Sequence, residues 1–155
     1  MDAPMKPGQF IFEVDEKEGQ AVRSLEELDS LCVSAFQKSA VSVYLILKSG
    51  KSPERWEKIL YPLLAMKIPD EVVQLGVCAK ANLAHVTFEE NDEEWTIPSS
   101  QAEEMADRVC LQTGDGEPFW VSSAKCIAKD KAVELLREFF SSRKRPRSVL
   151  WQKTP

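Results

Sequence analysis

The segment 128–153 constrains the fold more than any other part of this chain. Its first half has apolar residues at helical spacing, so one face of a helix is apolar and the other is charged. These apolar positions are Ala132, Leu135, Leu136, Phe139 and Phe140. Cations follow at 143–145, where they favour the negative end of the helix dipole, and Pro146 prevents the helix from continuing. Residues 148–152 then alternate as a half-buried strand does. The sequence therefore predicts a core-facing helix, a basic turn and a short returning strand.

The same segment carries a family signature. An alanine near the helix start, a leucine–arginine–glutamate–phenylalanine run, an arginine–proline turn and a tryptophan on the last strand follow one another. The residues are Ala132, Leu136, Arg137, Glu138, Phe139, Arg145, Pro146 and Trp151. This pattern resembles the C-terminal signature of the first-numbered family of bacterial immunity proteins, the antidotes of polymorphic toxins. One position departs from it: where the family usually has glycine, this chain has Arg143. Either Arg143 adopts a left-handed conformation, which costs roughly 1 kcal/mol relative to glycine, or the helix ends differently.

The resemblance implies a function. Members of that family often accompany deaminase-type toxins, so it implies a non-catalytic protein that binds a cognate toxin and blocks its active site. A toxin that attacks nucleic acids needs a cationic surface for phosphates, and an acidic segment docked there would exclude the substrate. The expected partner is therefore a basic toxin domain, with no nucleic acid or membrane bound directly by this chain. The oligomeric state is left open.

Length and composition agree with one ordinary domain. The chain has 155 residues, of which 43% are hydrophobic and 29% charged, enough for one core without disulfides or metal. Residues 1–8 are expected to be a flexible leader and 9–155 a single domain. The net charge of -5 argues against a general nucleic-acid binder. No apolar run is long enough to span a bilayer, and the four cysteines form no C-x-x-C pair, which indicates free thiols in a reducing compartment.

The remaining chain alternates between strand and helix patterns. Strands are predicted at 9–14, 40–47, 72–79, 83–89, 108–112 and 118–124. A helix begins at the capping box of Ser24, and Pro62 shortens or kinks a second helix in 54–66. Ser52 is its expected N-cap, and another short helix is predicted at 100–107. The order favours an α+β fold with a mainly antiparallel sheet, completed by the strands at 108–112 and 118–124, and helices packed on one face.

The most unusual charge pattern lies at 89–117, where ten acids face one base, Arg108. Three interpretations stay open: a solvated loop, a patch that meets a cationic partner, and a carboxylate site for catalysis or a divalent metal. The spaced ligands and turn glycine of a calcium loop are missing. The hypothesis of a partner-binding patch selects Glu89, Glu90, Asp92, Glu93, Glu94 and Trp95, because an aromatic residue beside acids is typical of interfaces. The alternative for Trp95 is a place in the core, which is more common for a tryptophan at a strand end.

Other motifs give no positive indication of an enzyme. Gly50-Lys51-Ser52 lacks the first glycine of a phosphate loop, and the lone His85 has no partners at catalytic or metal-ligand spacing. No catalytic residue, metal or cofactor is therefore predicted. The run 143–147 carries four cations and fits either a solvated helix end or a nucleic-acid patch. The alternative function is a non-catalytic adaptor or scaffold domain that binds an unrelated protein, and an enzyme built on carboxylates or a cysteine comes third.

Overall fold

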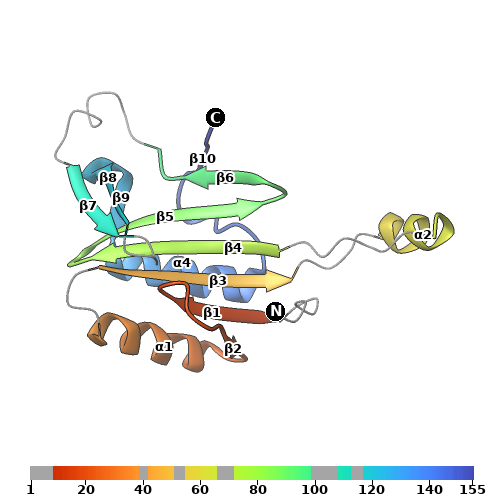
Figure 1. Ribbon diagram of the computed structural model, residues 1–155, viewed down its shortest axis with the longest axis horizontal. Coiled ribbons are helices and arrows are strands. Elements are labelled where there is room, and N and C mark those ends of the chain that lie inside the picture. The colour runs from red at the N-terminus through yellow and green to blue at the C-terminus, as the bar shows by residue number, and fades with distance from the viewer. Residues whose placement is uncertain (1–8, 39–41, 51–54, 66–71, 99–107, 113–116) are drawn as a thin grey trace.

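The computed structural model describes residues 9–38, 42–50, 55–65, 72–98, 108–112 and 117–155. Within these residues, eight strands form one sheet whose pairings are all antiparallel (Figure 1). In spatial order they are β10 (Gln152–Lys153), β6 (Glu93–Thr96), β5 (Leu83–Glu90), β4 (Val72–Lys80), β3 (Ser42–Gly50), β1 (Phe10–Val14) and β2 (Gln20–Val22), with β9 (Cys126–Ala128) paired to β5 beside β6. The short strands β2, β6 and β9 have no counterpart among the predicted elements.

Two helices cover one face of this sheet, α1 (Leu25–Lys38) and α4 (Lys129–Ser142). The predicted α+β fold, with a mainly antiparallel sheet and helices on one face, is confirmed. The capping box at the start of α1 is also confirmed, because the Ser24 hydroxyl accepts a hydrogen bond from the N–H of Glu27 at 3.1 Å. The carboxylate of Glu27 accepts from the N–H of Arg23 at 2.8 Å, one residue before the usual partner. No helix in the described part of the chain is both long and apolar enough to cross a bilayer.

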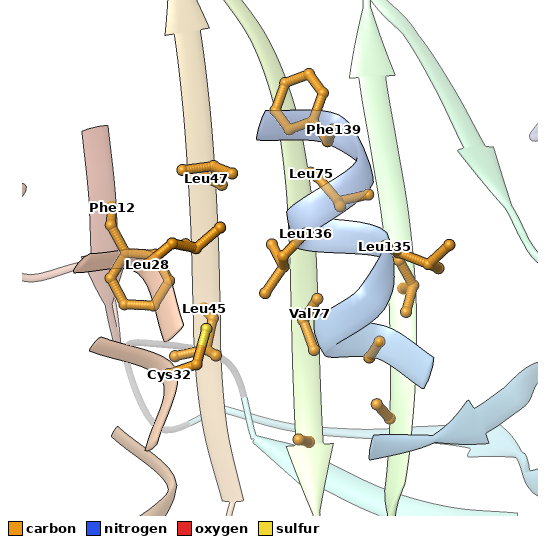
Figure 2. Packing of buried hydrophobic residues seen from close by; sticks show 14 of the residues in the cluster. Phe12, Leu28, Cys32, Leu45, Leu47, Leu75, Val77, Leu135, Leu136 and Phe139 are labelled. Carbon is orange, nitrogen blue, oxygen red and sulfur yellow. The ribbon is translucent and has the colours of Figure 1, made fainter. Parts of the chain in front are cut away.

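The core forms where α4 packs on the long central strands (Figure 2). Alternate residues of β3, β4 and β5 point toward the helices, which is the two-residue period of a strand. The side chain of Phe139 is fully buried, and its ring meets those of Phe10 and Phe88 edge to face, with centroids 5.5 and 5.6 Å apart. The other fully buried residues at this contact are Leu45, Leu47, Leu75, Val77, Val86, Phe88, Leu135 and Leu136. The predicted core face of the C-terminal helix is therefore correct.

The second face of the sheet carries a separate two-stranded ribbon of β7 (Arg108–Gln112) and β8 (Pro118–Ser122). The prediction that these strands complete the main sheet is wrong. The outer edge of β5 is already occupied by β6 and β9, so no hydrogen-bonding edge remains there for β7. The ribbon instead packs through Leu111 and Val121 on Cys78, and a 3-10 turn, η1 (Ser123–Lys125), leads from it to β9.

The helix α2 (Arg55–Leu63) stands away from the sheet (Figure 1). Pro62 is its penultimate residue, so the prediction of a short helix limited by this proline is confirmed. Its apolar side chains are exposed rather than buried in the core. The predicted leader 1–8, the N-cap Ser52 and the helix at 100–107 lie outside the described residues.

We expect the α4 contact to dominate stability. Replacing Leu136 by alanine should lower the free energy of unfolding by about 2–5 kcal/mol, because Leu136 is fully buried and the truncation leaves a cavity. The matched control is Leu150→Ala. The side chain of Leu150 is 80% exposed, so its truncation should change the free energy of unfolding by less than about 0.5 kcal/mol. Urea denaturation followed by circular dichroism measures both, and equal effects would contradict this core.

Candidate functional site

The acidic residues selected from the sequence form a β-hairpin. Glu90 pairs with Glu93 across a two-residue turn of Asn91 and Asp92, whose φ angles are 54° and 60°. Two successive left-handed residues are typical of the tightest hairpin turns, and Asn and Asp tolerate this conformation better than most residues. The interpretation as a solvated loop is therefore wrong for 89–96, which belong to β5, its turn and β6. The signal available in the sequence was the Asn-Asp pair before an alternating strand.

The hairpin divides these residues between the two faces of the sheet. Because side chains alternate along a strand, Glu93 and Trp95 lie on the helical side together with Glu90. Glu89 and Glu94 lie opposite each other on the second face. The exposed Asp92 occupies the turn. The six predicted contact residues are thus adjacent in the fold but do not form a single patch.

On the helical side, the basic turn that follows α4 faces the acidic hairpin. The Arg145 guanidinium carbon lies 3.8 Å from the ring centroid of Trp95, a cation–π contact, and the Lys153 ammonium lies 2.6 Å from the carboxylate of Glu93. A polar groove of about 670 Å³ runs between the hairpin and the turn, with Lys144 and Arg147 also on its wall. Sequence reasoning treated the acidic segment and the basic run separately, and only the fold brings them together.

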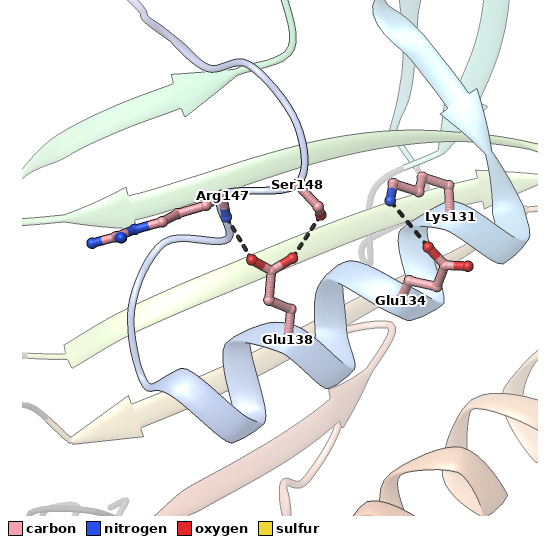
Figure 3. A network of polar contacts seen from close by, with 5 residues as sticks. All are labelled: Lys131, Glu134, Glu138, Arg147 and Ser148. Atoms are coloured by element: carbon pink, nitrogen blue, oxygen red, sulfur yellow. Dashed lines mark hydrogen bonds and ion pairs between the residues drawn. The ribbon is translucent and has the colours of Figure 1, made fainter.

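Glu138 on α4 holds the basic turn in place (Figure 3). Its carboxylate accepts hydrogen bonds from the main-chain N–H of Arg147 and from the hydroxyl of Ser148, both at 2.6 Å. Desolvation acts to raise the pKa of Glu138, but the hydrogen bonds from Ser148 and Arg147 outweigh it and lower the pKa. The indole N–H of Trp151 donates to the carbonyl of Pro146 at 2.8 Å. The turn is therefore fixed from both of its ends.

Arg143 ends the helix in the left-handed conformation, with φ 60° and ψ 18°. Its N–H donates to the carbonyl of Phe139 at 2.8 Å, which satisfies one of the last carbonyls of α4. The side chain compensates part of the backbone strain, because its guanidinium lies 5.6 Å from the ring centroid of Phe10. Of the two possibilities left open by the sequence, the left-handed one is confirmed.

On the second face, the repulsion between Glu89 and Glu94 is only partly offset. Like charges directly opposite each other destabilise an antiparallel pair. The carboxylate of Glu89 accepts a hydrogen bond from the neutral amide of Gln74 at 2.9 Å, while the nearby Lys48 is ion-paired with Glu13 at 2.8 Å. Burial raises the pKa of Glu89, and the charge of Glu94 raises it further, against the smaller effects of Gln74 and Lys48.

This negative field extends along the second face to Tyr44. Burial raises the pKa of the Tyr44 phenol to about 12, and the negative charges of Glu89, Glu16 and Glu94 contribute to the shift. A phenolate is therefore disfavoured here, so Tyr44 acts as a neutral hydroxyl and not as a base.

Three groups with potential chemistry stand in a row across the same face. Cys78 is paired with His85, which is paired in turn with Cys126. Burial lowers the pKa of His85, assisted by Lys125, and burial raises the pKa of Cys78 to about 12. The thiols of Cys78 and Cys126 donate to the carbonyls of Gln112 and Ser122.

The cysteines of this row do not form a disulfide, because strands two apart in a sheet are separated by about 10 Å, which is too far for an S–S bond. All four cysteines are free, and no three His, Cys, Asp or Glu side chains among the described residues are grouped to hold a metal.

No protein-family model and no curated protein sequence matches this chain. The family resemblance therefore stays a hypothesis carried by the residues between 132 and 151. In the structure these residues have two tasks: Phe139 fills the core, while Glu138 and Trp151 hold the Arg-Pro turn.

Removal of the Glu138 carboxylate should loosen the basic turn. Its pKa is lower in the folded protein than the ordinary value of 4.5, so its stabilisation is complete above that value and is lost as the pH falls through the folded-state pKa. We expect Glu138→Gln to lower the free energy of unfolding at pH 7 by about 0.5–1 kcal/mol, allowing for solvent screening. The difference from wild type should shrink below pH 4.5, and a difference that is constant with pH would contradict this role.

Replacing Glu89 should have the opposite effect. Its pKa is raised in the folded protein, so the ionised carboxylate is unfavourable above the folded-state pKa, and this penalty disappears as the pH falls through it. Glu89→Gln keeps an oxygen acceptor for Gln74 and should stabilise the protein at pH 7 by a few tenths of a kcal/mol. Thermal unfolding between pH 4 and pH 7 measures the gain, with the exposed Glu18→Gln as control. A loss of stability at pH 7 would show that the repulsion is already compensated.

Proposed function

We propose that this chain is a bacterial immunity protein of the cytoplasm. It binds a cognate toxin domain that attacks nucleic acids, such as a deaminase, and blocks its active site without chemistry of its own. The acidic hairpin formed by β5 and β6 is the contact surface. The family resemblance of the C-terminal segment suggests the class of partner, and the electrostatics of the hairpin support this surface.

The supporting observation is the placement of like charges on the hairpin. Glu93 has a close internal cation in Lys153, 2.6 Å away, whereas the carboxylate of Glu89 accepts a hydrogen bond from the neutral amide of Gln74 at 2.9 Å. Asp92 and Glu94 are exposed. A cationic side chain from a partner would relieve the repulsion between Glu89 and Glu94, so part of the binding free energy comes from strain already present in the free protein. Complementary charge also speeds the encounter of the two proteins.

The hairpin suits inhibition because it is held in place before binding. β5 is hydrogen-bonded to β4 along its length, and β6 is held by β10 and by the stack of Arg145 on Trp95. A segment ordered in advance loses little conformational entropy on docking. Occupation of a cationic cleft by these carboxylates would exclude the phosphates of a substrate.

The runner-up is an adaptor domain that uses the basic turn. The observation in its favour is the groove of about 670 Å³, where Lys144, Arg145 and Arg147 lie on one wall. Such a wall fits an acidic peptide, which a nucleic-acid-targeting toxin would not be expected to present.

Calorimetric titration with the candidate toxin domain encoded beside the gene tests the proposal at low and moderate salt. We expect one-to-one binding that weakens with salt, and about 30-fold weaker binding for the double variant Asp92→Asn, Glu94→Lys. Asparagine is chosen at position 92 because it tolerates the positive φ.

The matched control is Glu18→Gln, Glu26→Lys, which makes the same change in net charge at two exposed sites away from the hairpin. Equal weakening of toxin binding by both double variants would show that the effect comes from net charge alone and not from the hairpin. Tight binding that neither variant nor salt alters would keep the immunity function but place the contact elsewhere. No binding to a neighbouring toxin, together with binding of acidic peptides that Arg147→Glu abolishes, would favour the adaptor.

A further inference from the structure

The helix α2 presents a continuous apolar stripe to solvent. Its anchors follow the spacing i, i+3, i+4 and i+7, and their exposed fractions are 54% for Trp56, 58% for Ile59, 44% for Leu60 and 77% for Leu63. An isolated helix of nine residues is only marginally stable in water. Contiguous exposed apolar surface on a protein usually marks an interaction site. We therefore expect this apolar stripe to pack against another surface.

A groove of matching character lies between α1 and α4. It has a volume of about 580 Å³, and apolar side chains of Cys32, Val33, Phe36 and Val133 line it. Val33 is 54% exposed, although it lies on a helix that packs on the core. Charged residues form the rims, including the ion pair of Arg137 with Asp29 at 3.4 Å. An apolar groove between charged rims is the kind of site that receives one face of an amphipathic helix.

The α2 of the same chain is poorly placed to reach this groove. Both ends of α2 are tied to one end of the sheet, where Gly50 of β3 pairs with Val72 of β4. The groove starts at the opposite end, since the N–H of Lys129 bonds to the carbonyl of Asn82 in the β4–β5 turn. The nine residues of β3 separate the two ends by roughly 27 Å, whereas the five Cα–Cα steps from Gly50 to Arg55 span at most about 18 Å, so the start of α2 cannot reach the Lys129 end of the groove. A second molecule has no such restriction.

We propose that α2 of one molecule packs into the α1–α4 groove of a second copy of this chain. The reciprocal contact gives a two-fold dimer in which the apolar stripe on α2 of each molecule covers the groove of the other. Charge favours the pairing, because the exposed Lys58 places a positive charge on α2. Three acids and two bases line the groove, a net charge of -1. This dimer uses neither the acidic hairpin nor the basic turn and is independent of the proposed immunity function.

Sedimentation velocity of the full chain over a range of concentrations tests the dimer. We expect a concentration-dependent species of twice the 17.5 kDa chain mass. Leu63→Asp in α2 and Val33→Asp in the groove should each weaken dimerisation at least about 30-fold. Leu150→Asp is the matched control, since Leu150 is 80% exposed on a different surface and should leave the dimer unchanged. Circular dichroism establishes that each variant is folded.

Different results would overturn the proposal in different ways. A wild-type chain that stays monomeric at the highest concentration reached excludes the dimer. If that monomer nevertheless binds the toxin, and Leu63→Asp weakens the binding, α2 belongs to the toxin interface. A dimer that Leu63→Asp dissociates and Val33→Asp leaves intact would place α2 against another surface of the second copy, such as the partner's α2.

Discussion

The contact between α4 and the central strands is the interaction on which the rest of the structure depends. Leu135, Leu136 and Phe139 are fully buried there, so the helix cannot rotate or slide without opening the core. The residues that follow α4 are held in place because the helix itself is fixed. Arg143 ends the helix at a defined position, and Glu138 on the partly exposed side of the same helix binds the returning chain at Arg147 and Ser148. One helix thus both closes the core and positions the basic turn.

The basic turn and the strand after it determine which side of the acidic hairpin has cations close by. The turn supplies Arg145 to Trp95, and the strand after it supplies Lys153 to Glu93, all on the helical side of the sheet. On the second face, the carboxylate of Glu89 is hydrogen-bonded to the neutral amide of Gln74, and its pKa is raised by burial and by the charge of Glu94. The two sides of a single hairpin therefore differ in electrostatic state, and the side with the residual repulsion is the one that gains most from a cationic partner.

The acidic hairpin and α2 extend from the same end of the sheet. Glu89 pairs with Gln74, close to Val72, where the chain returns from α2. The two surfaces have different chemistry, since one is charged and the other apolar. Charged surfaces give rapid and salt-sensitive association, whereas apolar helix faces contribute through burial of area. A protein with both can engage two different partners without competition for the same contacts.

The sequence by itself determined the local structure. Periodicity predicted α1, α4 and the strands β4 and β5, Ser24 and Glu27 predicted the helix start, and Pro62 predicted the short α2, because each of these depends on neighbours within a few residues. It also predicted the α+β class and the side of α4 that faces the core. Only the tertiary structure decided that β7 and β8 form their own ribbon, that Trp95 stacks under Arg145, and that the apolar face of α2 is exposed. These outcomes depend on which sheet edges are already occupied and on contacts between residues as far apart as 95 and 145, and no local pattern in the chain encodes such distances.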